Sequence, residues 1–182
     1  ISGANASTLT LTAVQPAASG RYAVIVQNSV GATSASANLT VNPLPVVTIG
    51  AAPSSTICLG SSVTLTANNN ASNPSYLWSP SGATTASINV SPTSTTSYSV
   101  LVTDGTTSCT NSASTTITVN QPTTATALTS VTNACPGTAV SFSTTAGGTG
   151  PHTYVWRKNG VAIGGQTGSS LTFAAVAVGD AG

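Results

Sequence analysis

The sequence predicts an all-β protein made of tandem β-sandwich modules, one complete and two partial. Three observations lead to this prediction: stretches in which apolar and hydroxyl residues alternate, loop clusters of Gly, Asn, Pro and Ser between them, and an internal repeat. Alternation with a period of two places one face of a strand in a core and the other in water. Short strands at regular spacing, separated by turn residues, are typical of a sandwich.

The internal repeat defines the modules. Residues 170–182 (SLTFAAVAVGDAG) match residues 8–20 (TLTLTAVQPAASG) without a gap, at an offset of 162 residues (182 − 20), and a looser copy lies between them. Such self-similarity decides what one structural unit is. We therefore expect a window on a longer array. Its parts are the C-terminal half of a module (1–42), a complete module (45–119) and the N-terminal half of a module (122–182).

Within the complete module, strands are expected wherever the alternation is clearest. Pro43, Pro45 and Pro122 follow strand ends and separate the modules, because proline cannot donate a ladder hydrogen bond. The same order of signals appears when the last and first parts are joined into one module, with strands expected at 154–156 (YVW) and in the repeated stretches 8–11 (TLTL) and 170–173 (SLTF). The strands expected in the complete module are 63–67 (VTLTA), 76–78 (YLW), 87–90 (SINV), 98–102 (YSVLV) and 115–119 (TTITV).

The charge content excludes several classes of function. Charged residues make up 3% of the 182 residues, against about 25% in ordinary soluble domains. A net charge of +1 gives no field that would attract nucleic acid or an acidic membrane. No apolar run approaches the roughly 18 residues of a membrane helix. We therefore expect neither a nucleic-acid partner nor membrane insertion. The charged residues are Arg21, Asp104, Arg157, Lys158 and Asp180.

The same inventory argues against catalysis and cofactors. Acid–base chemistry by paired carboxylates needs two acids in one place, and Asp104 and Asp180 belong to different modules. Asp104 precedes Gly105 and is explained by turn chemistry. His152 is isolated in a loop, and no Cys or His spacing fits a metal site. The expected protein is not an enzyme and holds no metal or cofactor.

This order of signals resembles the tandem immunoglobulin-like β-sandwich repeats of large secreted bacterial surface proteins of the adhesin or stalk type. The resemblance covers nearly the whole chain and rests on Trp156, followed by RKNG, and on ASGRYAVIVQNSVG around Tyr22. In that family the tryptophan fills the core and the tyrosine hydroxyl closes a corner by bonding to upstream backbone. The resemblance implies these structural core roles for Trp78, Trp156, Tyr22 and Tyr98.

The cysteines depart from the antibody pattern. The two positions that antibody domains bridge are here Ala67 and Val100, so that bridge is absent. Cys58 precedes one strand and Cys109 follows the Asp104 turn, and both lie near the ends of their expected strands. We expect a Cys58–Cys109 disulfide, which would indicate an oxidising compartment, with Cys135 free. Two unrelated thiols and a metal-binding role are the alternatives.

The resemblance and the scarcity of residues suited to catalysis or metal binding together imply a function. We expect a non-catalytic extracellular repeat segment, on the cell surface or secreted, that forms the stalk or filament of a giant adhesin-like protein. Its partners would be neighbouring modules or copies arranged head-to-tail, with each half-module completed by covalent continuation or by another protomer. The alternatives are an accessory module of a secreted hydrolase and a glycan-binding module. For the latter the loops at 68–75 and 147–153 offer surface but no residue that supports a surface glycan.

Overall fold

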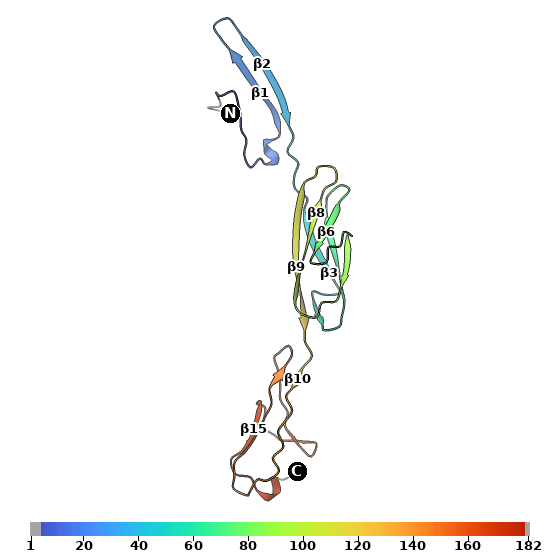
Figure 1. Cartoon of the computed structure of the whole chain (residues 1–182), viewed down its shortest axis with the longest axis vertical. Helices are drawn as coiled ribbons and strands as arrows, with labels where there is room; N and C mark the ends of the chain where they lie inside the picture. Colours follow the sequence, from blue (N-terminus) through green and yellow to red (C-terminus); the bar gives the residue numbers. More distant parts are fainter. Residues whose placement is uncertain (1–4, 181–182) are drawn as a thin grey trace. The chain divides into compact units, whose positions relative to one another are not determined.

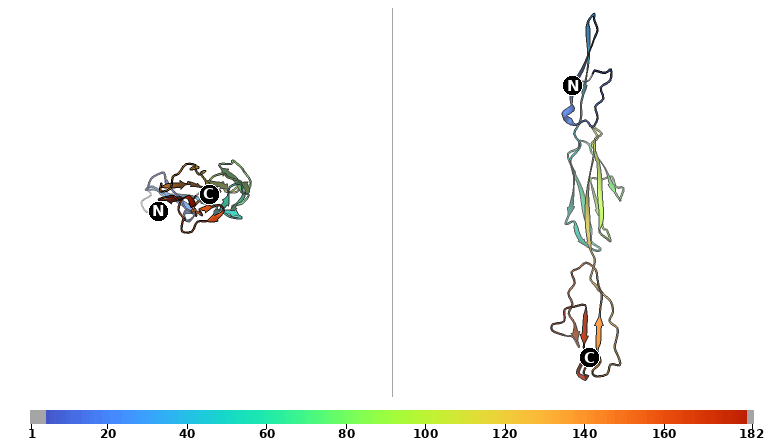
Figure 2. Two further views of the ribbon diagram at one scale, coloured as in Figure 1. Left: turned by 90° about the horizontal axis from the view of Figure 1, so that it is seen from below. Right: turned by 90° about the vertical axis from the view of Figure 1, so that its left-hand side faces the viewer.

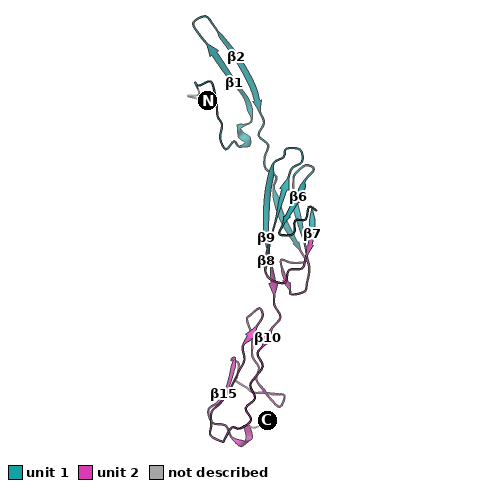
Figure 3. Cartoon of the chain, viewed as in Figure 1, with its two compact units in different colours: residues 1–51, 64–88, 97–115 teal, residues 52–63, 89–96, 116–182 magenta. Residues whose placement is uncertain are grey.

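The structure, a computed structural model, describes residues 5–180, and they contain strands, turns and two short 3-10 helices. Contacts between Cα atoms divide the chain into two compact units, residues 1–51, 64–88 and 97–115 and residues 52–63, 89–96 and 116–182 (Figure 3). Along the sequence the elements fall into three groups. We call them the first segment (5–42), the middle segment (45–120) and the third segment (122–180).

The first segment consists of one hairpin and the chain that precedes it. Strands β1 (Gly20–Gln27) and β2 (Ala32–Leu39) pair antiparallel, from Gly20 opposite Leu39 to Gln27 opposite Ala32 (Figure 1). The Asn28 side chain closes the turn, because its Oδ1 accepts hydrogen bonds from the backbone N–H groups of Val30 and Gly31. The 3-10 helix η1 (Pro16–Ala18) precedes β1. No residue between 5 and 42 is buried.

The middle segment is a complete two-layer sandwich. One sheet has the strand order β3-β5-β7 and the other β4-β9-β8-β6, and the turned view shows them as two layers (Figure 2). Their alternating residues face the interior, which explains the sequence pattern. Its strands are β3 (Val47–Ala52), β4 (Thr56–Cys58), β5 (Val63–Asn69), β6 (Ser75–Ser79), β7 (Ser87–Val90), β8 (Thr96–Thr103) and β9 (Thr110–Asn120).

The core of the middle segment contains only apolar residues and one tyrosine. Trp78 is 1% exposed, and its indole Nε1–H donates to the Thr85 carbonyl at 2.8 Å, so the one polar atom of the ring is satisfied. Val100 lies directly opposite Trp78 in the β6–β8 ladder and is fully buried. The other buried residues are Pro45, Ile57, Val63, Leu65, Ala67, Ile88, Tyr98, Val102, Ile117 and Val119.

One pairing in this sandwich is parallel. Strand β4 runs parallel to the end of β9, with Thr56 opposite Thr118 and Cys58 opposite Asn120. Strand β6, by contrast, pairs antiparallel with β8. The three-residue β4 is too short to give a periodic signal, so the sequence did not predict it.

The third segment forms fewer and shorter ladders. Strand β11 (Val140–Ser143) pairs with β15 (Ser170–Phe173), with Phe142 opposite Leu171. Two further pairs are β10 (Thr124–Ala125) with β12 (Ala146–Gly147) and β13 (Arg157–Lys158) with β14 (Val161–Ala162). The 3-10 helix η2 (Val178–Asp180) follows. Only Trp156 and Leu171 are buried among residues 122–180.

The predicted fold class is confirmed: the chain is all-β, with one complete and two partial sandwich modules. Two expected strands are missing, however, and both would need a partner strand that their segment lacks. Residues 8–11 and residues 154–156 form no ladder, although Tyr76–Trp78, the equivalent of 154–156, lie within β6. In the middle segment that stretch pairs with β8. The module boundaries at 42, 45, 119 and 122 stay a prediction.

Candidate interaction site

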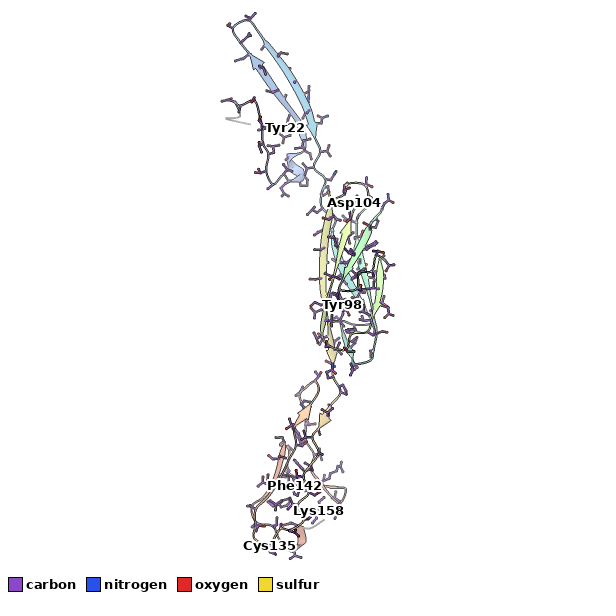
Figure 4. All side chains as sticks on the ribbon, in the orientation of Figure 1. Tyr22, Tyr98, Asp104, Cys135, Phe142 and Lys158 are labelled. Atoms are coloured by element: carbon purple, nitrogen blue, oxygen red, sulfur yellow. The ribbon has the colours of Figure 1, made fainter. Side chains whose placement is uncertain are left out.

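The charged residues of the chain serve local structure. The Asp104 carboxylate accepts hydrogen bonds from the backbone N–H groups of Ser72 at 2.7 Å, Thr106 at 2.9 Å and Thr107 at 2.8 Å. These bonds hold the pKa of the Asp104 carboxyl below its ordinary value of 3.8, and the bond from Ser72 has the largest effect. The neighbouring Gly105 is needed, since a Cβ there would lie 2.5 Å from the Asn73 carbonyl oxygen. Asp104 therefore fastens two loops at one end of the middle segment (Figure 4).

The second acid and the lysine act in the same way in the third segment. Asp180 Oδ2 accepts a hydrogen bond from the Ala177 backbone at 2.8 Å, which closes the turn of η2. Lys158 Nζ donates to the carbonyl oxygen of Gly179, and Arg157 donates to the Gly160 carbonyl at 2.9 Å. Asn159 and Gly160 adopt positive φ values of 50° and 83°, as a tight hairpin turn between β13 and β14 requires.

The described part of the chain contains no constellation suited to metal binding. No group of three or more His, Cys, Asp or Glu residues comes together between residues 5 and 180. His152 Nε2 lies 3.1 Å from the carbonyl oxygen of Gly147, within its own loop. Across the same residues no helix is long and apolar enough to span a bilayer.

The expected Cys58–Cys109 disulfide is absent, because the structure places the two residues at opposite ends of one strand. Cys58 lies opposite Asn120, the last residue of β9, whereas Cys109 directly precedes Thr110, the first. Eleven residues of β-strand span about 33 Å, and a disulfide needs Cα atoms within about 7 Å. Both thiols are free, as is that of Cys135. The inference of an oxidising compartment from this bond therefore has no support.

Three of the four aromatic residues singled out by the sequence are buried, whereas Tyr22 is half-buried. Trp156 is buried, and its Nε1–H donates to the Gly168 carbonyl at 2.9 Å, much as Trp78 donates to Thr85. The Tyr22 hydroxyl donates to the Ala18 carbonyl at 2.8 Å, four residues upstream. Tyr98 is buried on β8.

The first segment exposes an apolar face that its counterpart in the middle segment buries. Val24 and Val26 on β1 correspond by sequence to Val100 and Val102 on β8, with Tyr22 in the place of Tyr98. Val100 and Val102 are both 0% exposed, but Val24 is 51% and Val26 61% exposed. The hairpin thus carries the core side chains of a sandwich without the sheet that would cover them.

The third segment also leaves core positions of a sandwich uncovered. A hollow of about 400 Å³ beside β11 and β15 is lined mainly by apolar side chains. Val140 and Phe142 line it, and they correspond by sequence to the fully buried pair Val63 and Leu65 of the middle segment. Phe142 is half-buried and is labelled in Figure 4. The sequence showed that each half-module lacks strands, but the position of this hollow depends on the side-chain geometry. The other lining residues include Val131, Phe173, Val176 and Asp180.

Comparisons with known proteins agree with this architecture. The model of the immunoglobulin I-set domain matches residues 2–41, and no curated protein matches the chain. The structure of Sidekick-1 immunoglobulin domains 1–4 is 19% identical over 93% of this chain and 54% of its own, with a TM-score of 0.50.

Two further solved structures have TM-scores of 0.48. The titin I-band fragment I67–I69 is 18% identical over 93% of this chain and 69% of its own. Three N-terminal domains of the outer capsid protein Hoc of bacteriophage RB49 are 17% identical, with 94% and 71% covered. Strand topology, the I-set match and the Sidekick-1 likeness lead to one conclusion: the chain is built of tandem immunoglobulin-like β-sandwich modules.

Proposed function

We propose that the chain is a non-catalytic structural segment of an extracellular repeat protein, and that it forms part of the stalk or filament of a large adhesin-like surface protein. The observation that carries this proposal is the internal repeat, in which residues 170–182 match residues 8–20 on either side of a complete sandwich module. Repeated modules of this kind stack into arrays in which each module contacts its neighbours.

The chemistry of the described residues supports a structural role. The charged groups that could act on a substrate are engaged in turn and loop hydrogen bonds, as with Asp104 and Asp180. Polarity is supplied by Ser, Thr, Asn and Gly. Such a surface has little with which to attract a charged partner, which suits a spacer.

The extracellular setting rests on the resemblance of the sequence to secreted surface repeats. The array is supported by the Sidekick-1 structure, which is likewise a succession of immunoglobulin domains. The free cysteines add nothing to this argument. A bacterial source follows only from the resemblance of the sequence to bacterial surface repeats.

Antibody labelling of the source cells tests the proposal. A purified antibody raised against residues 45–120 should decorate intact, unpermeabilised cells in immunogold electron microscopy, and on a denaturing gel it should detect a very large polypeptide. Labelling that requires permeabilisation would contradict the extracellular role. A band of ordinary enzyme size that co-purifies with secreted hydrolase activity would instead indicate an accessory module.

A further inference from the structure

The turn between β13 and β14 contains the one asparagine of the sequence that is followed by glycine, Asn159-Gly160. Both residues are exposed, with φ values of 50° and 83°. An Asn-Gly pair favours such a two-residue hairpin turn, which explains its place between the two strands. The pair also puts a side-chain amide next to a backbone nitrogen that no neighbouring Cβ shields. The turn therefore has a chemical property besides its shape.

The two reacting groups of this pair are not held by hydrogen bonds. Within residues 5–180, none engages the Asn159 side chain or the Gly160 N–H. The β13–β14 ladder consists of two residue pairs, from Arg157 opposite Ala162 to Lys158 opposite Val161. Because a ladder this short opens readily, the Gly160 nitrogen can reach the side-chain carbonyl carbon of Asn159.

Positive charge is concentrated at this turn. Arg157 and Lys158 directly precede Asn159 and are two of the three Lys and Arg residues of the chain. The Arg157 guanidinium donates to the carbonyl oxygen of Gly160 at 2.9 Å, which keeps its charge at the turn. The Asp180 carboxylate, by contrast, is engaged by a backbone N–H of its own turn. The cations favour the deprotonated form of the Gly160 nitrogen, which is the form that attacks a carbonyl carbon.

We propose that Asn159 is a site of spontaneous chemical modification, at which its side-chain amide becomes a carboxylate. The Gly160 nitrogen, after losing its proton to hydroxide, forms a bond to Cγ of Asn159. The Cγ–Nδ2 bond breaks, and Nδ2 takes up a proton and leaves as ammonia. Water then opens the resulting cyclic imide: cleavage at Cγ gives aspartate, and cleavage at the main-chain carbonyl carbon gives isoaspartate. Water is the only co-reactant, and the reaction is independent of the structural role proposed above.

Comparable sites elsewhere in the chain are held by hydrogen bonds. Asn28 and Asn111 are each followed by the small residue serine. The Asn28 side chain accepts two backbone hydrogen bonds in its own turn, and Asn111 Nδ2 donates to a backbone carbonyl at 2.8 Å. Asp104-Gly105 could form the same imide, but its carboxylate binds three backbone N–H groups and the Gly105 N–H donates to the Ser72 carbonyl at 2.8 Å. The modification should therefore occur first at Asn159.

The two products differ in their effect on the hairpin. Aspartate keeps it, because Asp-Gly suits the same turn. Isoaspartate routes the main chain through Cβ and lengthens the turn, so that Lys158 and Val161 can no longer pair in the same register. Either product adds a carboxylate that is ionised at neutral pH, and the net charge falls from +1 to 0 (1 − 1). The chain thus acquires, as it ages, a charge that its sequence does not encode.

Peptide mapping of the aged chain tests the proposal. The full chain is incubated without denaturant at pH 8 and at pH 5, digested with chymotrypsin and analysed by mass spectrometry, with fragmentation that distinguishes isoaspartate from aspartate. The informative peptide is 157–173, which lies between the cleavage sites at Trp156 and Phe173. Conversion at Asn159 should be faster at pH 8, because hydroxide starts the reaction. It should also be about tenfold faster or more than at Asn28 and Asn111, where a hydrogen bond must break first.

Two variants serve as controls. Asn159→Gly has no amide to react, yet Gly-Gly suits the same turn, so the hairpin should form. Its peptide should keep its mass, and isoelectric focusing should show none of the acidic band that the unmodified chain develops. Arg157→Gln should slow the conversion about fivefold at low salt, which is the effect of one charge about 4 Å away in water.

Two outcomes would overturn the proposal. If the peptide that contains Asn159 kept its mass in the folded chain but changed it in denaturant, the turn would protect the amide rather than expose it to attack. If Asn28, Asn111 and Asn159 converted at the same rate, the turn would have no reactivity of its own. Conversion confined to Asn159 and absent from Asn159→Gly would support the proposal.

Discussion

Replacing Trp78 with alanine tests the packing of the middle segment. Trp78 is 1% exposed and lies opposite the fully buried Val100, so its removal leaves a cavity that the two sheets cannot close without moving. Truncation of such an aromatic side chain costs about 3–5 kcal/mol. It also removes the hydrogen bond from the indole to the Thr85 carbonyl 2.8 Å away, which contributes about 0.5–1.5 kcal/mol. Domains of this size are stable by about 5–15 kcal/mol, so the segment should lose a large share of its stability.

The measurement should report on the middle segment within the full chain. Hydrogen exchange followed by mass spectrometry does so, because peptides from β5, β6 and β8 can be read separately. In Trp78→Ala their slowest amides should exchange at least a hundredfold faster, since every 1.4 kcal/mol corresponds to a factor of ten in the opening equilibrium. Peptides from β1, β2 and β11 should be unchanged.

The matched control is Leu77→Ala, one residue away on β6. Leu77 is 52% exposed and lies on the outer face, so this change should cost no more than about 0.5 kcal/mol. If Trp78→Ala protected the β5 and β8 amides as well as Leu77→Ala does, Trp78 would not fill the core and the argument from burial would fail.

The remaining predictions concern the hydrogen bond of the Tyr22 hydroxyl, the hydrogen bonds of the Asp104 carboxylate and the three thiols. Tyr22→Phe should weaken the protection of the Ser19–Tyr22 amides by about 0.5–1.5 kcal/mol, because the bond to the Ala18 carbonyl is lost; exchange rates like those of the unmodified chain would contradict it. The lowered pKa of Asp104 means that its stabilising effect is present above pH about 4 and is lost as the pH falls through the folded-state value. The thermal midpoint, followed by circular dichroism between pH 2 and 5, should therefore fall more steeply for the unmodified chain than for Asp104→Asn. An equal dependence of the midpoint on pH in the two chains would refute a stabilising role of the Asp104 carboxylate. All three cysteines should react with maleimide under native, unreduced conditions, with half-buried Cys109 slowest, and a mass showing two protected cysteines would restore the disulfide.

Local patterns in the sequence were enough to predict the strands and the core of the complete module. Alternation at 63–67 and 98–102 gives β5 and β8 because both strands have partners on the same module. The same reasoning overpredicted residues 8–11 and 154–156, because a strand also needs a neighbour, and a pattern along one stretch does not show whether the neighbour exists.

Contacts between residues far apart along the chain could not be predicted from the sequence. The parallel pairing of β4 with the end of β9 places Cys58 far from Cys109, and three residues carry no periodicity that would reveal it. The bond from the Ser72 amide to Asp104 joins residues 32 positions apart, so only its local half, the turn at Asp104 and Gly105, could be predicted. Tyr22, by contrast, bonds to a carbonyl four residues away, which a local motif describes well.

The near absence of ionisable groups has a consequence for how the protein meets its surroundings. With five charged side chains and one histidine, the chain changes its protonation very little across the range in which most proteins lose or gain many protons. Added salt has little to screen, and acidification has only Asp104 and Asp180 to neutralise. An array of such modules should keep nearly the same surface charge when the salt concentration or the pH of the surrounding water changes. Its surface depends on hydroxyl and amide groups that no ordinary change of pH can switch.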